Sequence, residues 1–168
     1  MSTKLDMPIA TSAIDSSGEI LEIENVDISD FLEGRAWANW EHNNEHAEDI
    51  VGKFIYAKKI LKASDCENKR QKMYWDKIKN PFIYGIVELM DDEHHPGAVA
   101  VAAMVRYFAK RKEPILVGAS IEGQTLEREG SVLKRAVARK CAITLKPCNK
   151  QCWVDLIEDV PGADTLKS

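Results

Sequence analysis

The chain is organised around Pro114-Ile115-Leu116-Val117-Gly118-Ala119-Ser120-Ile121-Glu122-Gly123, a short apolar segment that presents one serine. Alternation along a β-strand places Ser120 and Glu122 on one face, and Ala119 and Ile121 on the other. The small neighbouring residues leave the hydroxyl uncrowded, as a nucleophile that attacks a carbonyl requires. The Gly-x-Ser-x-Gly nucleophile elbow is absent, so this segment alone also fits an ordinary strand serine.

The composition is that of one globular domain. The chain has 168 residues, of which 45% are hydrophobic and 30% charged. No apolar run approaches the roughly 20 residues that span a bilayer, and no basic segment leads into an apolar one as in a secretory signal. We therefore expect an intracellular protein without a membrane partner. The net charge of −4 argues against a general nucleic-acid binder, so no specific nucleic-acid partner is expected.

The cysteines are expected to be reduced thiols in an intracellular protein. A zinc site could in principle be built from Cys141, Cys148 and Cys152 with His94 or His95. The spacing of these residues matches no common structural-zinc pattern. We therefore expect neither a metal nor a cofactor.

Residues 1–19 are rich in small and polar residues and suggest a mobile arm, and residues 161–168 suggest a loose tail. The single domain is expected over residues 20–160. Its strands are expected over residues 20–24, 36–42, 50–60, 82–90 and 132–145, in addition to the serine strand. In the third of these, Phe54 and Tyr56 are expected on one face.

Two main helices are expected to flank the strands. A capping box at Ser64 and Glu67 predicts a helix over residues 65–79, and an apolar stripe predicts another over residues 98–112. Strands outnumber helices and their order is mixed. The fold class is therefore α+β, with a mostly antiparallel sheet or barrel.

Five short motifs cover roughly residues 36–152: Trp40-Glu41-His42-Asn43-Asn44, Ile50-Val51-Gly52-Lys53, Tyr84-Gly85-Ile86-Val87-Glu88-Leu89, Val117-Gly118-Ala119-Ser120-Ile121-Glu122-Gly123 and Ala142-Ile143-Thr144-Leu145-Lys146-Pro147-Cys148-Asn149. In their order and spacing they resemble the prohead (head maturation) proteases of tailed bacteriophages. The resemblance implies the fold of the herpesvirus assemblins. It also implies that Ser120 is the nucleophile and His42 its general base.

That assignment agrees with the chemistry. A serine hydroxyl is a weak nucleophile until an imidazole within hydrogen-bond reach takes its proton, and histidine titrates near neutral pH. His94, His95 and His46 are competing bases. The position of His94 and His95 just before a helix favours a structural or capping role for them.

The third catalytic residue is left open. Family members usually place an acidic residue or a histidine on a strand behind the base, but the return strand offers only Lys140, Ala142 and Thr144 there. The alternatives are a carboxylate from the neighbouring strand, a hydrogen bond from Thr144, or a catalytic dyad; the candidate carboxylates are Glu88, Asp91 and Asp92.

The resemblance implies a viral serine endopeptidase that acts inside the assembling procapsid, in the host cytoplasm. Capsid and scaffold proteins, and the chain itself, would be its substrates, and self-association is a further expectation. The alternative is a catalytically inactive scaffold or core component of the procapsid with the same fold. A small metal-binding module is the third hypothesis.

Overall fold

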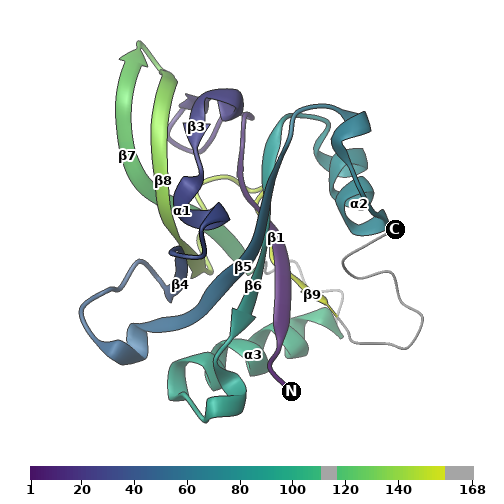
Figure 1. The fold of residues 1–168 in the computed structure, drawn as a ribbon, viewed down its shortest axis with the longest axis vertical. Helices are drawn as coiled ribbons and strands as arrows, with labels where there is room; N and C mark the ends of the chain where they lie inside the picture. The colour runs from purple at the N-terminus through teal and green to yellow at the C-terminus, as the bar shows by residue number, and fades with distance from the viewer. Residues whose placement is uncertain (111–116, 158–168) are drawn as a thin grey trace.

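The computed structural model describes residues 1–110 and 117–157, which form an α+β fold (Figure 1). Nine strands of the described chain form one sheet: β1 (Lys4–Thr11), β2 (Ile20–Leu21), β3 (Val26–Asp27), β4 (Trp37–Trp40), β5 (Ile50–Ile60), β6 (Phe82–Leu89), β7 (Gly118–Glu129), β8 (Val132–Thr144) and β9 (Asp155–Ile157). The helices are α1 (Ser29–Leu32), α2 (Lys69–Ile78) and α3 (Pro96–Ala109). The predicted α+β class is therefore confirmed.

The sheet is mixed: five of the described strand pairings are antiparallel and three are parallel. Its main path runs β2-β8-β4-β5-β6-β1-β9, and β3 and β7 also pair with β8. The long strand β8 is antiparallel to β7 but parallel to β2, β3 and β4. The strands described here do not close into a barrel.

Strand β6 separates two hydrophobic clusters, as expected for a strand buried on both faces. Phe82, Tyr84 and Ile86 face one cluster, which α2 covers. The alternate residues face the larger cluster, which β1 and α3 also line. In Figure 1, α3 lies at the bottom of the molecule and α2 at its upper right. The two predicted flanking helices are thus present, and each covers apolar side chains of the sheet.

Both helices begin at residues other than those predicted. Asn68 caps α2, because its Oδ1 accepts a hydrogen bond from the Gln71 amide at 2.9 Å. The predicted capping box at Ser64 is wrong, since the preceding turn is held by Asp65, whose carboxylate accepts from the Leu61 amide at 2.9 Å. α3 begins at Pro96, with His95 as its N-cap.

The prediction of a mobile arm over residues 1–19 is wrong for Lys4–Thr11. These residues form β1, which is almost completely buried and pairs with β6 on one side and with β9 on the other. Asp6 is fully buried there because Arg70, Tyr74 and Tyr84 all donate hydrogen bonds to its carboxylate. The predicted loose tail, residues 161–168, lies outside the described residues.

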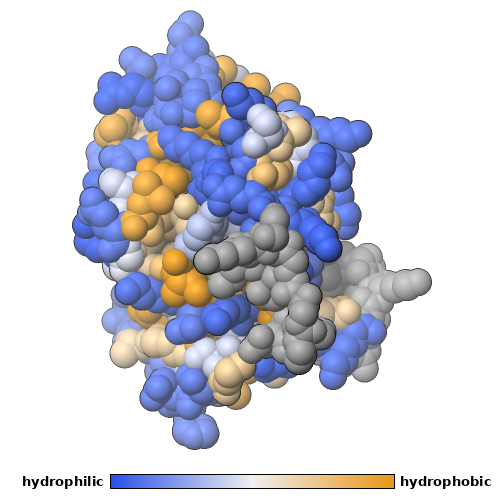
Figure 2. All heavy atoms as spheres, turned by 45° about the vertical axis from the view of Figure 1, so that its right-hand side comes forward, coloured by the Kyte–Doolittle hydropathy of each residue, from blue (hydrophilic) through white to orange (hydrophobic). Residues whose placement is uncertain are grey.

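The molecular surface carries only small apolar patches on the face that Figure 2 draws, where orange residues are scattered among hydrophilic ones. None of the helices in the described part of the chain is long and apolar enough to cross a membrane.

Candidate active site

Strand β7 presents Ser120 and Glu122 on the same face of the sheet. Ser120 pairs with Ala142 of β8, and Glu122 pairs with Lys140, without a register shift between the two pairs. The register shifts between Glu122 and Gly123, because β8 has one extra residue there, Arg139. A Cβ added to Gly123 would lie 1.8 Å from the Val137 carbonyl oxygen. Position 123, where the regular pairing of β7 with β8 ends, therefore requires glycine. Residues 114–116 of the predicted serine strand lie outside the described residues.

Strand β4 brings a tight turn to the same face. Asn39 pairs with Ala142 on the other side of β8, so Ser120, Ala142 and Asn39 form one row across three strands. After β4 the chain reverses, and the Asn43 amide donates to the Trp40 carbonyl at 3.1 Å. The two central residues of this turn, Glu41 and His42, have φ values of 54° and 64°.

The turn places the imidazole of His42 against the carboxylate of Glu122. His42 Nδ1 lies 3.2 Å from Glu122 Oε2, with the histidine side chain 47% exposed and the glutamate side chain 18% exposed. An acid beside Nδ1 orients the ring, stabilises its protonated form and leaves Nε2 to exchange a proton. Among the described residues, however, no hydrogen bond joins Ser120 Oγ to His42.

Two asparagines hold Glu122 in place. The buried Asn39 donates from Nδ2 to Glu122 Oε2 and, at 2.9 Å, to Asn44 Oδ1. Asn44 donates from Nδ2 to Glu122 Oε1 at 3.2 Å, and Trp37 Nε1 donates to Asn44 Oδ1 at 3.1 Å. Both carboxylate oxygens therefore have amide donors in addition to the neighbouring imidazole.

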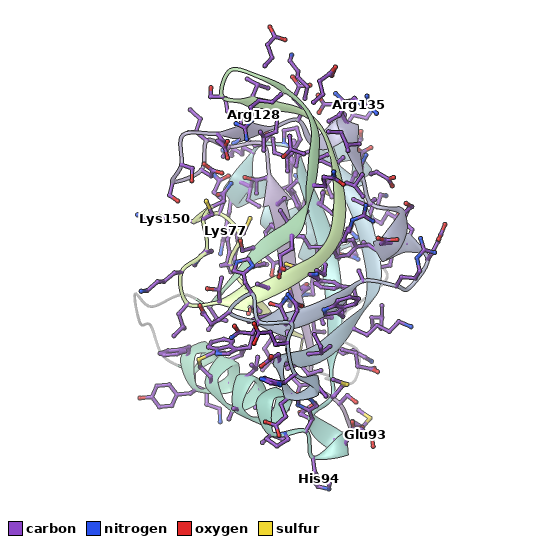
Figure 3. The ribbon with its side chains drawn as sticks, turned by 90° about the vertical axis from the view of Figure 1, so that its left-hand side faces the viewer. Lys77, Glu93, His94, Arg128, Arg135 and Lys150 are labelled. Carbon is purple, nitrogen blue, oxygen red and sulfur yellow. The ribbon has the colours of Figure 1, made fainter. Side chains whose placement is uncertain are left out.

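The structure does not bring the competing histidines to Ser120. His95 caps α3, because its Nδ1 accepts from the Ala98 amide at 3.1 Å, and its Nε2 lies 3.1 Å from the Ala47 carbonyl. Figure 3 shows His94 pointing away from the body of the protein, next to the start of α3. His46 lies exposed in the loop that follows His42. The predicted structural or capping role is confirmed for His95.

Two of the predicted alternatives for the third residue, Asp91 and Thr144, have other partners. The Asp91 carboxylate accepts hydrogen bonds from the amide and the hydroxyl of Thr3 at 2.9 and 2.6 Å. Thr144 Oγ1 accepts from the Lys146 amide at 3.0 Å. Glu122 was not among those alternatives, although strand alternation already places it on the face of Ser120.

A small cavity of about 100 Å³ lies on the other side of β7. Its lining includes Ile9 and Thr11 of β1, Ala119 and Ile121 of β7, and Cys152. Ser120 also borders it, but regular alternation directs the serine side chain to the opposite face, where Glu122 and Asn39 lie.

The cysteines do not form a metal site in the described part of the chain. No group of three or more histidine, cysteine, aspartate or glutamate side chains is arranged there to hold a metal ion. Burial raises the pKa of the Cys141 thiol well above its usual value and raises that of Cys152 to about 12. Both thiols are therefore protonated at neutral pH.

No protein-family model, curated protein or solved structure gives a significant match to this chain.

Proposed function

We propose that this protein is a serine endopeptidase in which Ser120 is the nucleophile, His42 the general base and Glu122 the acid that orients the base. One observation carries the proposal: His42 Nδ1 lies 3.2 Å from Glu122 Oε2, on the sheet face where Ser120 stands two residues before Glu122. A base in contact with an acid, and a serine on the same face of the sheet, are the parts that acyl transfer to a serine requires.

The proposed reaction is ordinary acyl transfer. His42 Nε2 takes the proton of the Ser120 hydroxyl while Oγ attacks the peptide carbonyl, and the imidazolium then returns the proton to the leaving amine. Water, activated by the same imidazole, hydrolyses the acyl-enzyme and frees Ser120. The Glu122 carboxylate stabilises the imidazolium through Nδ1. The missing hydrogen bond between Ser120 and His42 would form when substrate binds, since catalytic hydrogen bonds are often long in unliganded enzymes.

The substrate class is proposed from the sequence resemblance to the prohead proteases. The order of the relevant elements supports it: the His42 turn comes first, then β5 and β6, then α3 and the serine strand β7. On this proposal the fold is of the assemblin type, and the enzyme cleaves scaffold and capsid proteins, and itself, inside the assembling procapsid in the host cytoplasm.

The second candidate is a catalytically inactive component of the procapsid with the same fold. It is favoured by one observation, the lack of a hydrogen bond between Ser120 and His42 among the described residues. The two candidates differ in whether Ser120 reacts faster than an ordinary serine.

Labelling with a fluorophosphonate, followed by peptide mapping, separates them. The endopeptidase proposal predicts labelling of Ser120 in the wild type and in His94→Ala, and none in His42→Ala or Ser120→Ala. Ser131→Ala, in the hairpin turn, is the matched control for loss of a serine. Absence of labelling in concentrated, folded wild-type protein would reject the enzyme in favour of the inactive component.

Peptide-bond cleavage is tested separately. Wild type and Ser120→Ala are incubated with a proteome-derived peptide library, and new N-termini are identified by mass spectrometry. The proposal predicts cleavage products with the wild type alone. Labelling of Ser120 without any peptide cleavage would support a serine hydrolase but reject the proposal that it is an endopeptidase.

A further inference from the structure

The side chain of Asn39 makes the contacts that join the two halves of the candidate site. It lies on β4 with no exposed surface. Its Oδ1 accepts a hydrogen bond from the His42 amide at 3.0 Å, and its Nδ2 donates to Glu122 Oε2 and to Asn44 Oδ1. One buried carboxamide therefore contacts both the turn that carries the base and the carboxylate that faces the base.

Only a carboxamide of this length satisfies these partners. The His42 amide needs an acceptor, whereas the oxygens of Glu122 and Asn44 need donors. Aspartate supplies the acceptor but no donor and would place a second carboxylate against Glu122. Because Asn39 has no exposed surface, water does not readily replace a lost partner of its side chain, and an unsatisfied group there is costly.

The bond to the His42 amide also stabilises an unusual backbone. Glu41 and His42 have φ values of 54° and 64°, and non-glycine residues adopt such values rarely and at an energetic cost. The Asn39 bond to the His42 amide and the Asn43 bond to Trp40 together hold this conformation.

We propose that Asn39 is a positioning residue: its carboxamide fixes the His42 turn and the Glu122 carboxylate relative to each other, and so selects the imidazole tautomer with the proton on Nδ1. The structural part stands on the contacts alone. Its catalytic consequence rests on the proposed function, because only the Nδ1-protonated ring has Nε2 available as a base.

The tautomer is measured directly by the ¹⁵N shifts of the His42 ring at about pH 8, which require no activity. The wild type is expected to carry the proton on Nδ1. In Asn39→Asp and Asn39→Ala the proton is expected to move to Nε2. The rate of fluorophosphonate labelling of Ser120 is expected to fall by about 10- to 100-fold, the range typical of replacing residues that orient a metal-binding histidine.

Asn149→Asp is the matched control. Asn149 also accepts through Oδ1, from the Gln151 amide at 2.9 Å, and donates through Nδ2, to Thr11 Oγ1 at 2.6 Å. Asn149→Asp also replaces an amide nitrogen by an oxygen. It is expected to lower the stability of the protein without changing which nitrogen of His42 carries the proton.

The outcomes separate the two proposals. If the His42 proton moves to Nε2 in the Asn39 variants but not even the wild type is labelled, the positioning role is supported and the serine hydrolase is rejected. Normal labelling and an unchanged tautomer in those variants overturn the positioning role.

Hydrogen exchange of the wild type tests the same proposal if the Asn39 variants do not fold. The Asn39 bond predicts that the His42 amide exchanges its hydrogen at least about 10-fold more slowly than the Glu45 amide in the same exposed loop. Equal exchange would overturn the proposal.

Discussion

Glu122 Oε2 lies 3.2 Å from His42 Nδ1, although one residue comes from the middle of β7 and the other from the turn after β4. Strand β8 makes this contact possible, because it pairs with β7 on one side and with β4 on the other. On the proposed function, Glu122 is the third catalytic residue that the sequence motifs left open. It lies on the strand of the proposed nucleophile rather than on the return strand.

Replacing Glu122 by alanine is expected to slow fluorophosphonate labelling of Ser120 by about 10²-fold or more, because a general base that is not oriented loses much of its contribution. Without the carboxylate, the imidazolium that forms in the transition state loses its partner. Second-order labelling rates and melting temperatures are measured together. Glu127→Ala, an exposed position on the same strand, is the control and is expected to leave the rate unchanged. Equal rates for the two variants would show that Glu122 has no catalytic part.

The elements of the candidate site were predictable because local patterns define them. The alternation in residues 118–122 and the polar segment after Trp40 are both visible in the sequence. The contact between His42 and Glu122 was not predictable, since it depends on the pairing of β8 with both β4 and β7.

Two features of the fold were missed for a similar reason. A bulge at Ile55 turns Phe54 and Tyr56 to opposite faces of β5, so that Phe54 enters the larger cluster and Tyr56 contacts the α2 cluster. Strict alternation, from which one face was predicted for both, does not hold across a bulge. Likewise, the small and polar composition of residues 1–19 predicted a mobile arm. The partners that allow Asp6 of β1 to be buried, Arg70, Tyr74 and Tyr84, are remote in sequence.

Gly123→Ala is expected to destabilise the protein by about 1–3 kcal/mol, as other overpacking substitutions do. The new Cβ would lie 1.8 Å from the Val137 carbonyl oxygen, so the bulge beside Glu122 must open. Urea unfolding gives the free energy. Gly130→Asn is the control, because its φ of 60° suits asparagine and no atom lies within 4 Å of an added Cβ. A loss at Gly123 no larger than at Gly130 would contradict the prediction.

His95→Ala is expected to cost about 0.5–2 kcal/mol, the usual effect of removing a helix N-cap. The variant loses the bond from the Ala98 amide at 3.1 Å and the contact with the Ala47 carbonyl at 3.1 Å. His95→Asn keeps an N-cap acceptor and is expected to recover most of the stability. Because His95 lies outside the proposed catalytic set, both variants should still be labelled at Ser120. Loss of labelling in folded His95→Asn would instead indicate a catalytic histidine at this position.

Asp91 is expected to contribute to stability only above acidic pH. Burial of its carboxyl raises the pKa, but hydrogen bonds from Thr3 and the nearby Arg106 outweigh burial, so the folded pKa lies below the unfolded value of 3.8. The folded state therefore binds fewer protons, and the contribution, on the order of 1 kcal/mol, is present above about pH 4 and disappears as pH falls through the folded pKa.

The test compares unfolding free energies of the wild type and Asp91→Asn from about pH 7 to about pH 2. The gap between them is expected to be constant at neutral pH and to close in acid, since a protonated Asp91 offers the Thr3 amide no more than asparagine does. The exposed Asp92→Asn serves as the control and should follow the wild type throughout. A gap that persists unchanged at the lowest pH would mean that Asp91 stabilises the fold by packing rather than by its charge.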